Sequence, residues 1–227
     1  AEPIIMSQPT LYVAFPASDE LRDRIDAFLE ITREEPDSNH VQELEAIMDP
    51  FLDEVLHTYF TGPIDAVNAK GTAVNVILGA MKVISKAAHG LAGRLMRKTS
   101  VEEQRALAEH FRNLRLEKDG QVYIGYPLSP ALAERASLVF QEFADGNGQM
   151  PRLVEVMDGI SAGAIENYLD KTVGNLELGR INRGLVSGAR ATIKKASASS
   201  VEKGIPAMEK SHQKPVVAYF ESLLLQP

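Results

Sequence analysis

The chain of 227 residues contains no cysteine, which excludes disulfides, thiolate metal sites and cysteine nucleophiles together. It also lacks any apolar run of the roughly 18 residues that a membrane span requires. The most apolar stretch, residues 73–84, is interrupted by Asn75 and Lys82. No positively charged segment followed by an apolar one opens the chain, so nothing indicates export and the cytoplasm is the default expectation.

An excess of positive charge is missing as well. The net charge is −7, which argues against a nucleic-acid-binding protein because contacts with phosphate groups require Lys and Arg. The hydrophobic share of 44 % and the charged share of 24 % are typical of a globular protein that buries a substantial core. We therefore expect residues 1–227 to form a single globular unit.

The clearest pattern in the sequence is an internal repeat. Residues 11–18 (LYVAFPAS) match residues 122–129 (VYIGYPLS) position for position, and three of the eight positions are identical. The separation is 111 residues here and 109 residues later, where Leu44 aligns with Leu153 and Phe111 aligns with Phe220. These matches predict an internal duplication with copies at residues 10–118 and 121–225.

The distribution of charge repeats in the same way. Residues 1–60 and 101–178 carry net charges of −11 and −6, whereas residues 61–100 and 179–227 carry +5 each. An acidic block is therefore followed by a basic block in both copies. We predict two similar halves that are related by a pseudo-two-fold axis.

Each copy is predicted to begin with a strand and to continue as helices. Residues 11–15 and 122–126 are rich in aromatic and β-branched residues and end at a proline, which is typical of short strands. Ser18 and Ser129 are candidate N-caps. Apolar spacing then predicts helices that end near residues 34 and 144, and further helices over residues 41–60, 64–98, 100–115, 151–173 and 180–197, with a break at residues 61–63. The predicted fold class is mainly α, a helical bundle with a small β element at the seam between the halves.

Two local features add detail to this prediction. Asp119-Gly120 between alternating residues indicates a β-hairpin, although a helix that continues to a glycine cap at Gly120 is nearly as consistent. If the hairpin forms, the repeat predicts that residues 223–225 pair with residues 11–13. The matched pairs Gly79-Ala80 and Gly188-Ala189 are expected to let helix backbones pack closely.

The repeat also duplicates a possible acid–base pair. Asp49 and Tyr59 recur as Asp158 and Tyr168. Ten residues of continuous helix separate the members of each pair by about 15 Å, so contact within one copy is impossible. Asp49 would have to approach Tyr168 from the other copy, and Asp158 would have to approach Tyr59. The simpler interpretation is a helix-start aspartate and a tyrosine at the edge of the core.

Two Glu-x-x-His motifs have the spacing that carboxylate-bridged di-metal bundles use. They are Glu54 with His57, and Glu209 with His212. Neither motif recurs in the other copy, and His57 is predicted to point away from the apolar face of its helix. Surface residues are the simpler interpretation, a helical metal protein is a remote alternative, and the sequence indicates no particular cofactor.

Basic residues on two predicted helices give the main functional hypothesis. These are Lys82, Lys86, Arg183, Arg190, Lys194 and Lys195. If the two faces converge, they form a site for phosphate, a carboxylate or an acidic protein segment. Alternatively, they are solvated or complement the acidic helices of residues 19–54.

We therefore expect a non-enzymatic binding or interaction protein whose site lies between the two halves. The expected partner is a small anionic molecule or an acidic segment of another protein. The alternative is an enzyme that uses the duplicated Asp and Tyr residues in the cleft between the copies.

Overall fold

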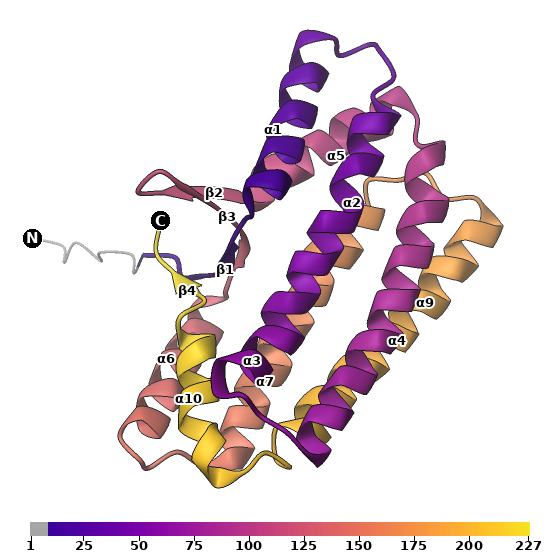
Figure 1. Cartoon of the computed structure of the whole chain (residues 1–227). Coiled ribbons are helices and arrows are strands. Elements are labelled where there is room, and N and C mark those ends of the chain that lie inside the picture. The colour runs from indigo at the N-terminus through magenta and orange to yellow at the C-terminus, as the bar shows by residue number, and fades with distance from the viewer. Residues whose placement is uncertain (1–8) are drawn as a thin grey trace, which may run out of the picture.

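The computed structural model describes residues 9–227 and shows a mainly helical protein with a small sheet at one side (Figure 1). The start of the chain, on which the expectation about export depends, lies outside the described residues. The helices of at least twelve residues are α1 (Asp19–Glu34), α2 (Val41–Leu56), α4 (Thr72–Leu95), α5 (Val101–Leu114), α6 (Pro130–Ala144), α7 (Met150–Ala164), α9 (Arg180–Ser199) and α10 (Lys210–Glu221). The shorter segments are α3 (Gly62–Val67), α8 (Lys171–Val173), the 3-10 turn η2 (Met96–Lys98) and three π-helical turns, η1 (His57–Thr61), η3 (Ile165–Asp170) and η4 (Ser200–Gly204).

The sheet has four antiparallel strands in the order β2-β3-β1-β4. They are β1 (Tyr12–Pro16), β2 (Arg115–Lys118), β3 (Gln121–Pro127) and β4 (Leu224–Leu225). The predicted hairpin is confirmed, because β2 and β3 are joined by Asp119 and Gly120 with φ angles of 51° and 77°. Two successive positive φ angles are what a type I′ turn requires. The predicted pairing of the chain ends is also confirmed, since Val13 lies opposite Leu224.

In the central strand pair, β1 with β3, the register is symmetric, so that equivalent tyrosine and proline residues lie opposite each other at both ends. Tyr12 lies opposite Pro127, and Pro16 lies opposite Tyr123. At the middle, Ala14 faces Gly125, where an added Cβ would collide with the backbone of β1. Glycine at this position therefore permits the close approach of the two strands.

The sheet connects two hydrophobic cores. Phe15 and Ile124 are buried in a core with residues of α1, α2 and α5. Val13 and Tyr126 are buried in a second core with residues of α6, α7 and α10. A third cluster, which includes Ile84 of α4 and Ile193 of α9, forms where these two helices pack along each other.

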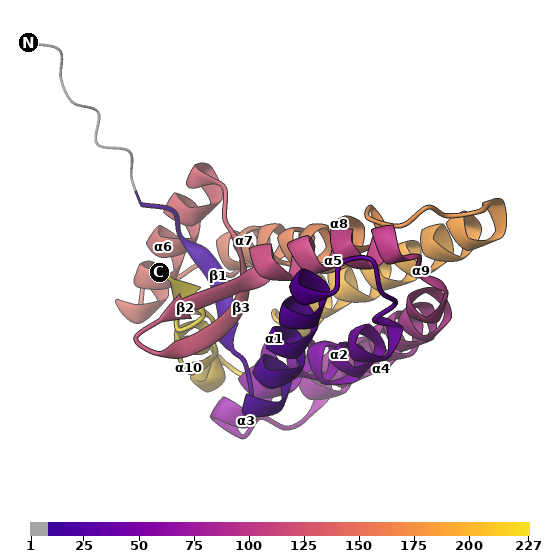
Figure 2. The same ribbon diagram turned by 90° about the horizontal axis from the view of Figure 1, so that it is seen from above.

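Four helices make up the body of the molecule. In Figure 1, α2 and α4 form one layer, and α7 and α9 lie behind it. The view from above in Figure 2 shows the same two layers, with the sheet at one edge and the α4–α9 contact towards the other. The space between the layers is thus bordered by the sheet on one side and by α4 and α9 on the other.

Two predicted helix boundaries are wrong. The helix predicted over residues 64–98 is divided, because Asn68 and Gly71 adopt φ angles of 49° and 98°. Asparagine and glycine tolerate this left-handed backbone better than other residues. Conversely, the break predicted at residues 61–63 does not occur, since Gly62 is helical and Pro63 lies in the first turn of α3, where proline is tolerated. Residues 41–67 therefore form one continuous helical run.

Of the pairs Gly79-Ala80 and Gly188-Ala189, which were expected to allow close helix packing, the alanines pack and the glycines do not. Both glycines are exposed, and a Cβ added to either would have no other atom within 4 Å. The adjacent Ala80 and Ala189 pack against the hydrophobic clusters instead. Alanine side chains, and not bare backbone, form these contacts.

We predict opposite effects for two glycine-to-alanine substitutions. Gly125→Ala should lower the free energy of unfolding by about 1–3 kcal/mol, because the new methyl group overpacks the β1–β3 contact. Gly79→Ala should raise it by about 0.5–1 kcal/mol, because an exposed helix position gains helix propensity without a clash. Urea denaturation of both variants measures the difference, and equal effects would contradict the close approach at Gly125.

Candidate functional site

A cavity of about 190 Å³ lies between the two helical layers and is partly open to the outside. Its walls come from α2, η1, α3 and α4 on one side and from α7, η3, α8, α9, η4 and α10 on the other. Thirty of the 36 lining residues are apolar. All 36 belong to the described part of the chain, and none of them is charged. The polar ones are Tyr59, Ser161, Tyr168, Thr172, Ser197 and Ser200. Such a lining suits an apolar molecule that makes a few hydrogen bonds.

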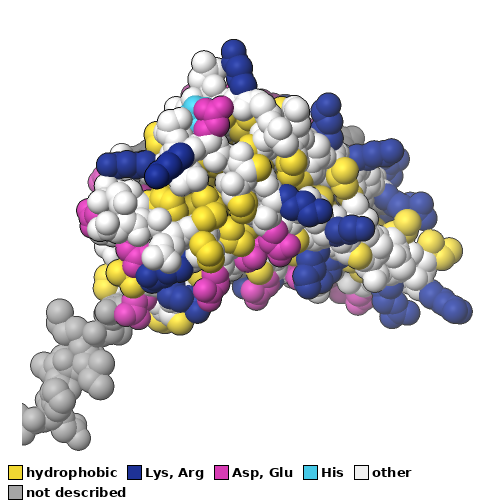
Figure 3. Space-filling view, turned by 90° about the horizontal axis from the view of Figure 1, so that it is seen from below, with side chains coloured by type: hydrophobic (Ala, Val, Ile, Leu, Met, Phe, Trp, Pro, Cys, Tyr) yellow, Lys and Arg dark blue, Asp and Glu magenta, His cyan; other side chains and the backbone are white. Residues whose placement is uncertain are grey.

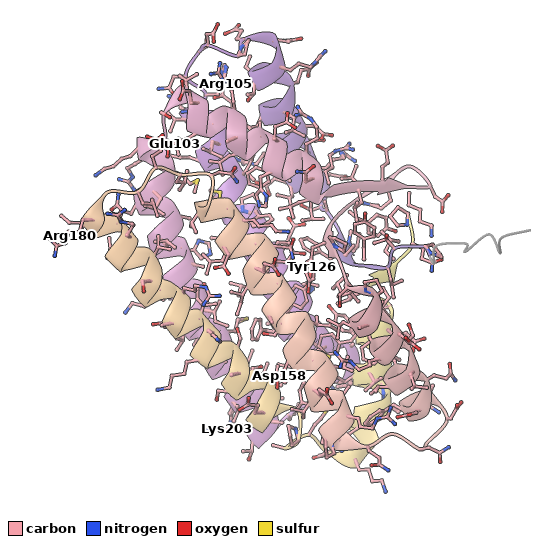
Figure 4. The ribbon with its side chains drawn as sticks, turned by 180° about the vertical axis from the view of Figure 1, so that it is seen from behind. Glu103, Arg105, Tyr126, Asp158, Arg180 and Lys203 are labelled. Carbon is pink, nitrogen blue, oxygen red and sulfur yellow. The ribbon has the colours of Figure 1, made fainter. Side chains whose placement is uncertain are left out.

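Tyr59 and Tyr168, which the predicted repeat aligns, meet in this cavity from opposite layers. Their ring centroids are 6.4 Å apart. Tyr168 also makes edge-to-face contacts with Phe51 and Tyr126, at centroid distances of 5.7 Å and 5.4 Å. Figure 4 shows Tyr126 deep in the middle of the molecule. The structure therefore places one aromatic cluster at the meeting point of both halves of the chain.

The hydroxyl groups of the three tyrosines differ in their hydrogen bonding. The hydroxyl of Tyr126 donates to the carbonyl oxygen of Ile160 at 2.6 Å. The hydroxyls of Tyr59 and Tyr168 are buried and have no hydrogen-bond partner within 3.5 Å among the residues that the structure describes, although the Tyr59 hydroxyl lies near those of Tyr168 and Tyr126. A buried polar group without a partner costs about 1–3 kcal/mol and is rare in folded proteins. Both hydroxyls lack such a partner, and because each oxygen exposes less than 1 Å² of surface, a bound molecule reaches them only when neighbouring side chains shift.

Burial keeps all three tyrosines uncharged. Loss of solvation raises the pKa of Tyr59 to about 12, although the nearby hydroxyls of Tyr168 and Tyr126 oppose part of the increase. Burial likewise raises the pKa of Tyr126 and Tyr168 well above the ordinary value, and the charge of a neighbouring tyrosinate would raise it further. At neutral pH each hydroxyl is consequently a hydrogen-bond donor.

The backbone that carries Tyr59 and Tyr168 is unusual. Both residues lie in π-helical turns, in which a backbone N–H bonds to the carbonyl five residues earlier. The Gly62 N–H donates to the His57 carbonyl, and the Lys171 N–H donates to the Glu166 carbonyl. The third π-turn, η4, supplies Ser200 and Val201 to the same cavity. Such turns are rare and frequently occur at functional sites.

The two aspartates of the proposed acid–base pairs do not line the cavity. Asp49 is exposed, and its carboxylate lies 3.1 Å from Nδ1 of His89, whose Nε2 lies 3.1 Å from Asp53. Asp158 is half-buried on α7, where burial and the charge of Glu202 raise its pKa. The structure thus brings the two tyrosines together and places the two aspartates elsewhere.

The six basic candidates all lie on the outside of the molecule. Lys82 and Lys86 are exposed on α4, and the remaining four are exposed on α9. None of them lines the cavity. Arg190 forms a bidentate ion pair with Asp170 at 2.8 Å and 3.0 Å. The basic faces and the space between the layers are therefore two separate features.

The Glu-x-x-His residues make local contacts. Glu54 accepts hydrogen bonds from the backbone N–H and the hydroxyl of Ser18, both at 2.7 Å, and so holds the start of α1. His57 contacts the Thr61 hydroxyl through Nδ1 at 2.7 Å. At the start of α10, the His212 N–H donates to the Glu209 carbonyl. Within residues 9–227 no group of three or more His, Asp or Glu residues is arranged to hold a metal ion.

Sequence reasoning did not identify Tyr126 or the apolar lining of the cavity. One signal was present, since Tyr126 aligns with Phe15 in the repeat and thus adds a hydroxyl at a buried strand position. The lining residues gave no comparable signal, because apolar residues at helical spacing indicate a core whether or not that core is completely filled.

Comparisons with known proteins find no matching family model, no matching curated protein and no matching solved structure. No helix within residues 9–227 is long and apolar enough to cross a bilayer. The function must therefore be argued from the cavity and from the surface.

Substitution of phenylalanine for each tyrosine tests the state of the hydroxyl groups. Tyr59→Phe and Tyr168→Phe should each raise the free energy of unfolding by about 1 kcal/mol, because each removes a buried donor that has no partner. Tyr126→Phe should lower it by about 1 kcal/mol, because it removes the hydrogen bond to Ile160. Urea denaturation provides the measurement, and three destabilised variants would refute the assignment.

The pKa of Tyr59 also predicts sensitivity to alkali. In the unfolded chain its hydroxyl ionises near pH 10, whereas in the folded protein it stays protonated to about pH 12. Since the folded state holds the extra proton, its stability falls as the pH rises through this window, by about 1.4 kcal/mol per pH unit. Urea denaturation between about pH 10 and 12 should show a slope that contains this contribution together with those of Tyr126 and Tyr168, and Tyr59→Phe should reduce it by about 1.4 kcal/mol per pH unit. An unchanged slope would mean that Tyr59 ionises normally.

Proposed function

We propose that the protein is a non-enzymatic binding protein that holds an apolar small molecule between its two helical layers. The observation that carries the proposal is the pair of buried hydroxyls, Tyr59 and Tyr168, in the wall of an otherwise apolar cavity. Each is a donor at neutral pH, so the molecule should carry a hydrogen-bond acceptor close to both. The rest of the molecule should be apolar.

The size of the cavity supports this proposal. An apolar cavity of about 150 Å³ is large enough to bind benzene. The cavity between the layers is larger, at about 190 Å³, and it is partly open to the outside. A bound apolar molecule would displace water from its apolar walls and would gain contacts with them.

The lining also favours a neutral molecule over an anion. An ionised carboxylate or phosphate inside the protein requires a charged partner, and no Lys or Arg of the described chain lines the cavity. A ketone, ester or amide oxygen accepts a hydrogen bond from a tyrosine without that requirement. The proposed ligand therefore differs from the anion that the basic residues suggested.

The proposal includes an internal duplication with a pseudo-two-fold axis through the cavity. In support, the order of strands and long helices recurs in the two parts of the chain. The pairing of Tyr12 with Leu225 corresponds in the repeat to the pairing of Tyr123 with Leu116. Each copy contributes one tyrosine-bearing π-turn to the shared site, and the second copy adds η4, which carries no tyrosine. An enzyme based on the duplicated Asp and Tyr residues has less support, because neither aspartate reaches the cavity wall.

Two matched probes test the binding site. Acetophenone carries a carbonyl acceptor, and α-methylstyrene has nearly the same shape without one. Both should raise the melting temperature of the protein, because they bind only the folded state. The preference for acetophenone should fall about fivefold in the double variant Tyr59→Phe with Tyr168→Phe, which is the loss expected for one hydrogen bond of about 1 kcal/mol.

Two alanines of α7 provide a matched control. Ala164→Leu should abolish binding of both probes, because Ala164 lines the cavity. Ala162→Leu should leave binding unchanged, because Ala162 is exposed on the same helix. Failure of either probe to bind, or the same loss in both alanine variants, would refute a site in the cavity.

A further inference from the structure

We propose that one end of the molecule docks onto a bilayer surface that contains anionic lipids. This end, the basic tip, consists of Arg94, Arg97, Lys98, Arg180, Ile181, Arg183 and Leu185. It is formed by the start of α9 and the end of α4. Figure 2 shows the start of α9 projecting at one extremity of the molecule, and Figure 4 places Arg180 at its outer end.

The basic tip combines exposed apolar side chains with a projecting shape. Residues 9–227 include four large hydrophobic residues that are exposed, and two of them, Ile181 at 73 % and Leu185 at 39 %, lie here. They are four residues apart, so they share one face of α9. Isolated exposed apolar residues are common, but a projecting apolar face beside cations is typical of helices that lie at a membrane surface.

The basic tip has five cations, and the acidic residues Glu102, Glu103 and Glu177 lie in the segments next to it. None of its five cations forms an ion pair within the described part of the chain. Arg94 donates to the side chain of Asn182 at 3.3 Å, which joins the end of α4 to the start of α9. The nearby Glu103 carboxylate is already bonded to the backbone N–H groups of Ser100 and Glu177. In Figure 3, Lys and Arg side chains crowd the side of the molecule that α4 and α9 occupy in Figure 2, with apolar side chains at the extremity.

This chemistry fits an anionic bilayer better than a second copy of the chain. The acidic helices α1 and α2 of another copy would complement the charge. However, the exposed large apolar residues outside the basic tip lie on α4 and α6, so α1 and α2 offer no exposed large apolar residue to cover Ile181. A bilayer interface attracts Lys and Arg through anionic head groups, and it accepts apolar side chains without needing a complementary pocket.

Docking at the basic tip does not depend on what the cavity holds, so the two proposals can fail separately. The cavity nevertheless reaches this end of the bundle. Met96, the first residue of η2, and Val173, the last residue before the loop that precedes α9, both line it.

Sedimentation with lipid vesicles tests the docking. The full chain should bind phosphatidylcholine vesicles that contain about one third phosphatidylserine, should bind pure phosphatidylcholine far more weakly, and should be released at high salt. Arg180→Gln with Arg183→Gln should weaken the partition by about 30-fold, which corresponds to the usual contribution of two cations. Ile181→Ser should weaken it by about tenfold through lost apolar contact.

Control variants keep the test specific. Arg33→Gln with Arg112→Gln removes the same charge from exposed positions of α1 and α5, and Leu138→Ser removes a side chain that is 52 % exposed on α6. Both should bind as the unchanged protein does. The docking is overturned if anionic vesicles do not bind the protein, or if the controls lose as much binding as the tip variants. It is also overturned if the tip substitutions abolish self-association in analytical ultracentrifugation, which would assign the basic tip to a second copy.

Discussion

The antiparallel contact between β1 and β3 is the constraint on which the rest of the structure depends. At its centre Ala14 faces Gly125 so closely that no side chain fits at the glycine. On either side of this point the two strands send Phe15 and Tyr126 into different cores. The two helical layers are therefore held together along one edge by the sheet. Along the opposite edge they are held together by the contact between α4 and α9. Layers that are fixed along both edges need not close completely in between, and the cavity lies there.

The residues and the backbone around the cavity are not those that would give the most stable fold. Phenylalanine at positions 59 and 168 would keep the aromatic contacts and would remove two buried donors that have no partner. Regular α-helix in place of the π-turns would restore ordinary backbone hydrogen bonding. Departures from local stability that gather at one place are typical of functional sites, where stability is lost in exchange for binding or catalysis. Here they gather around one cavity, and this coincidence is stronger evidence for a site than any one of them alone.

The sequence predicts those parts of the structure that depend on local chemistry. Ser18 and Ser129 accept hydrogen bonds from the backbone at the start of α1 and α6 as capping residues do, and Asp119-Gly120 forms the two-residue turn. The division at Asn68 was missed because asparagine adopts the left-handed backbone only in some contexts. The cavity was missed for another reason. Whether Ala164 and Ile84 touch a neighbour or face open space depends on the distance between layers, and the spacing of apolar residues contains no information about that distance. Tyr59 and Tyr168 were found through the repeat, but the burial of their hydroxyls depends on the same distance.

The alternation of charge along the chain acquires a meaning from the fold. The two basic blocks contain α4 and α9, which pack along each other although both carry positive charge. Their contact is apolar, through residues such as Ile84 and Ile193, while the cations point outward into water, where repulsion is screened. Burial of the isoleucine side chains, at about 1.5–3 kcal/mol each, therefore outweighs the repulsion between exposed charges. The result is a protein with a net charge of −7 in which two neighbouring helices, α4 and α9, both present exposed cations. The electric field of an anionic surface orients such a molecule before contact. The distribution of charge therefore determines which end of the protein meets the surface first.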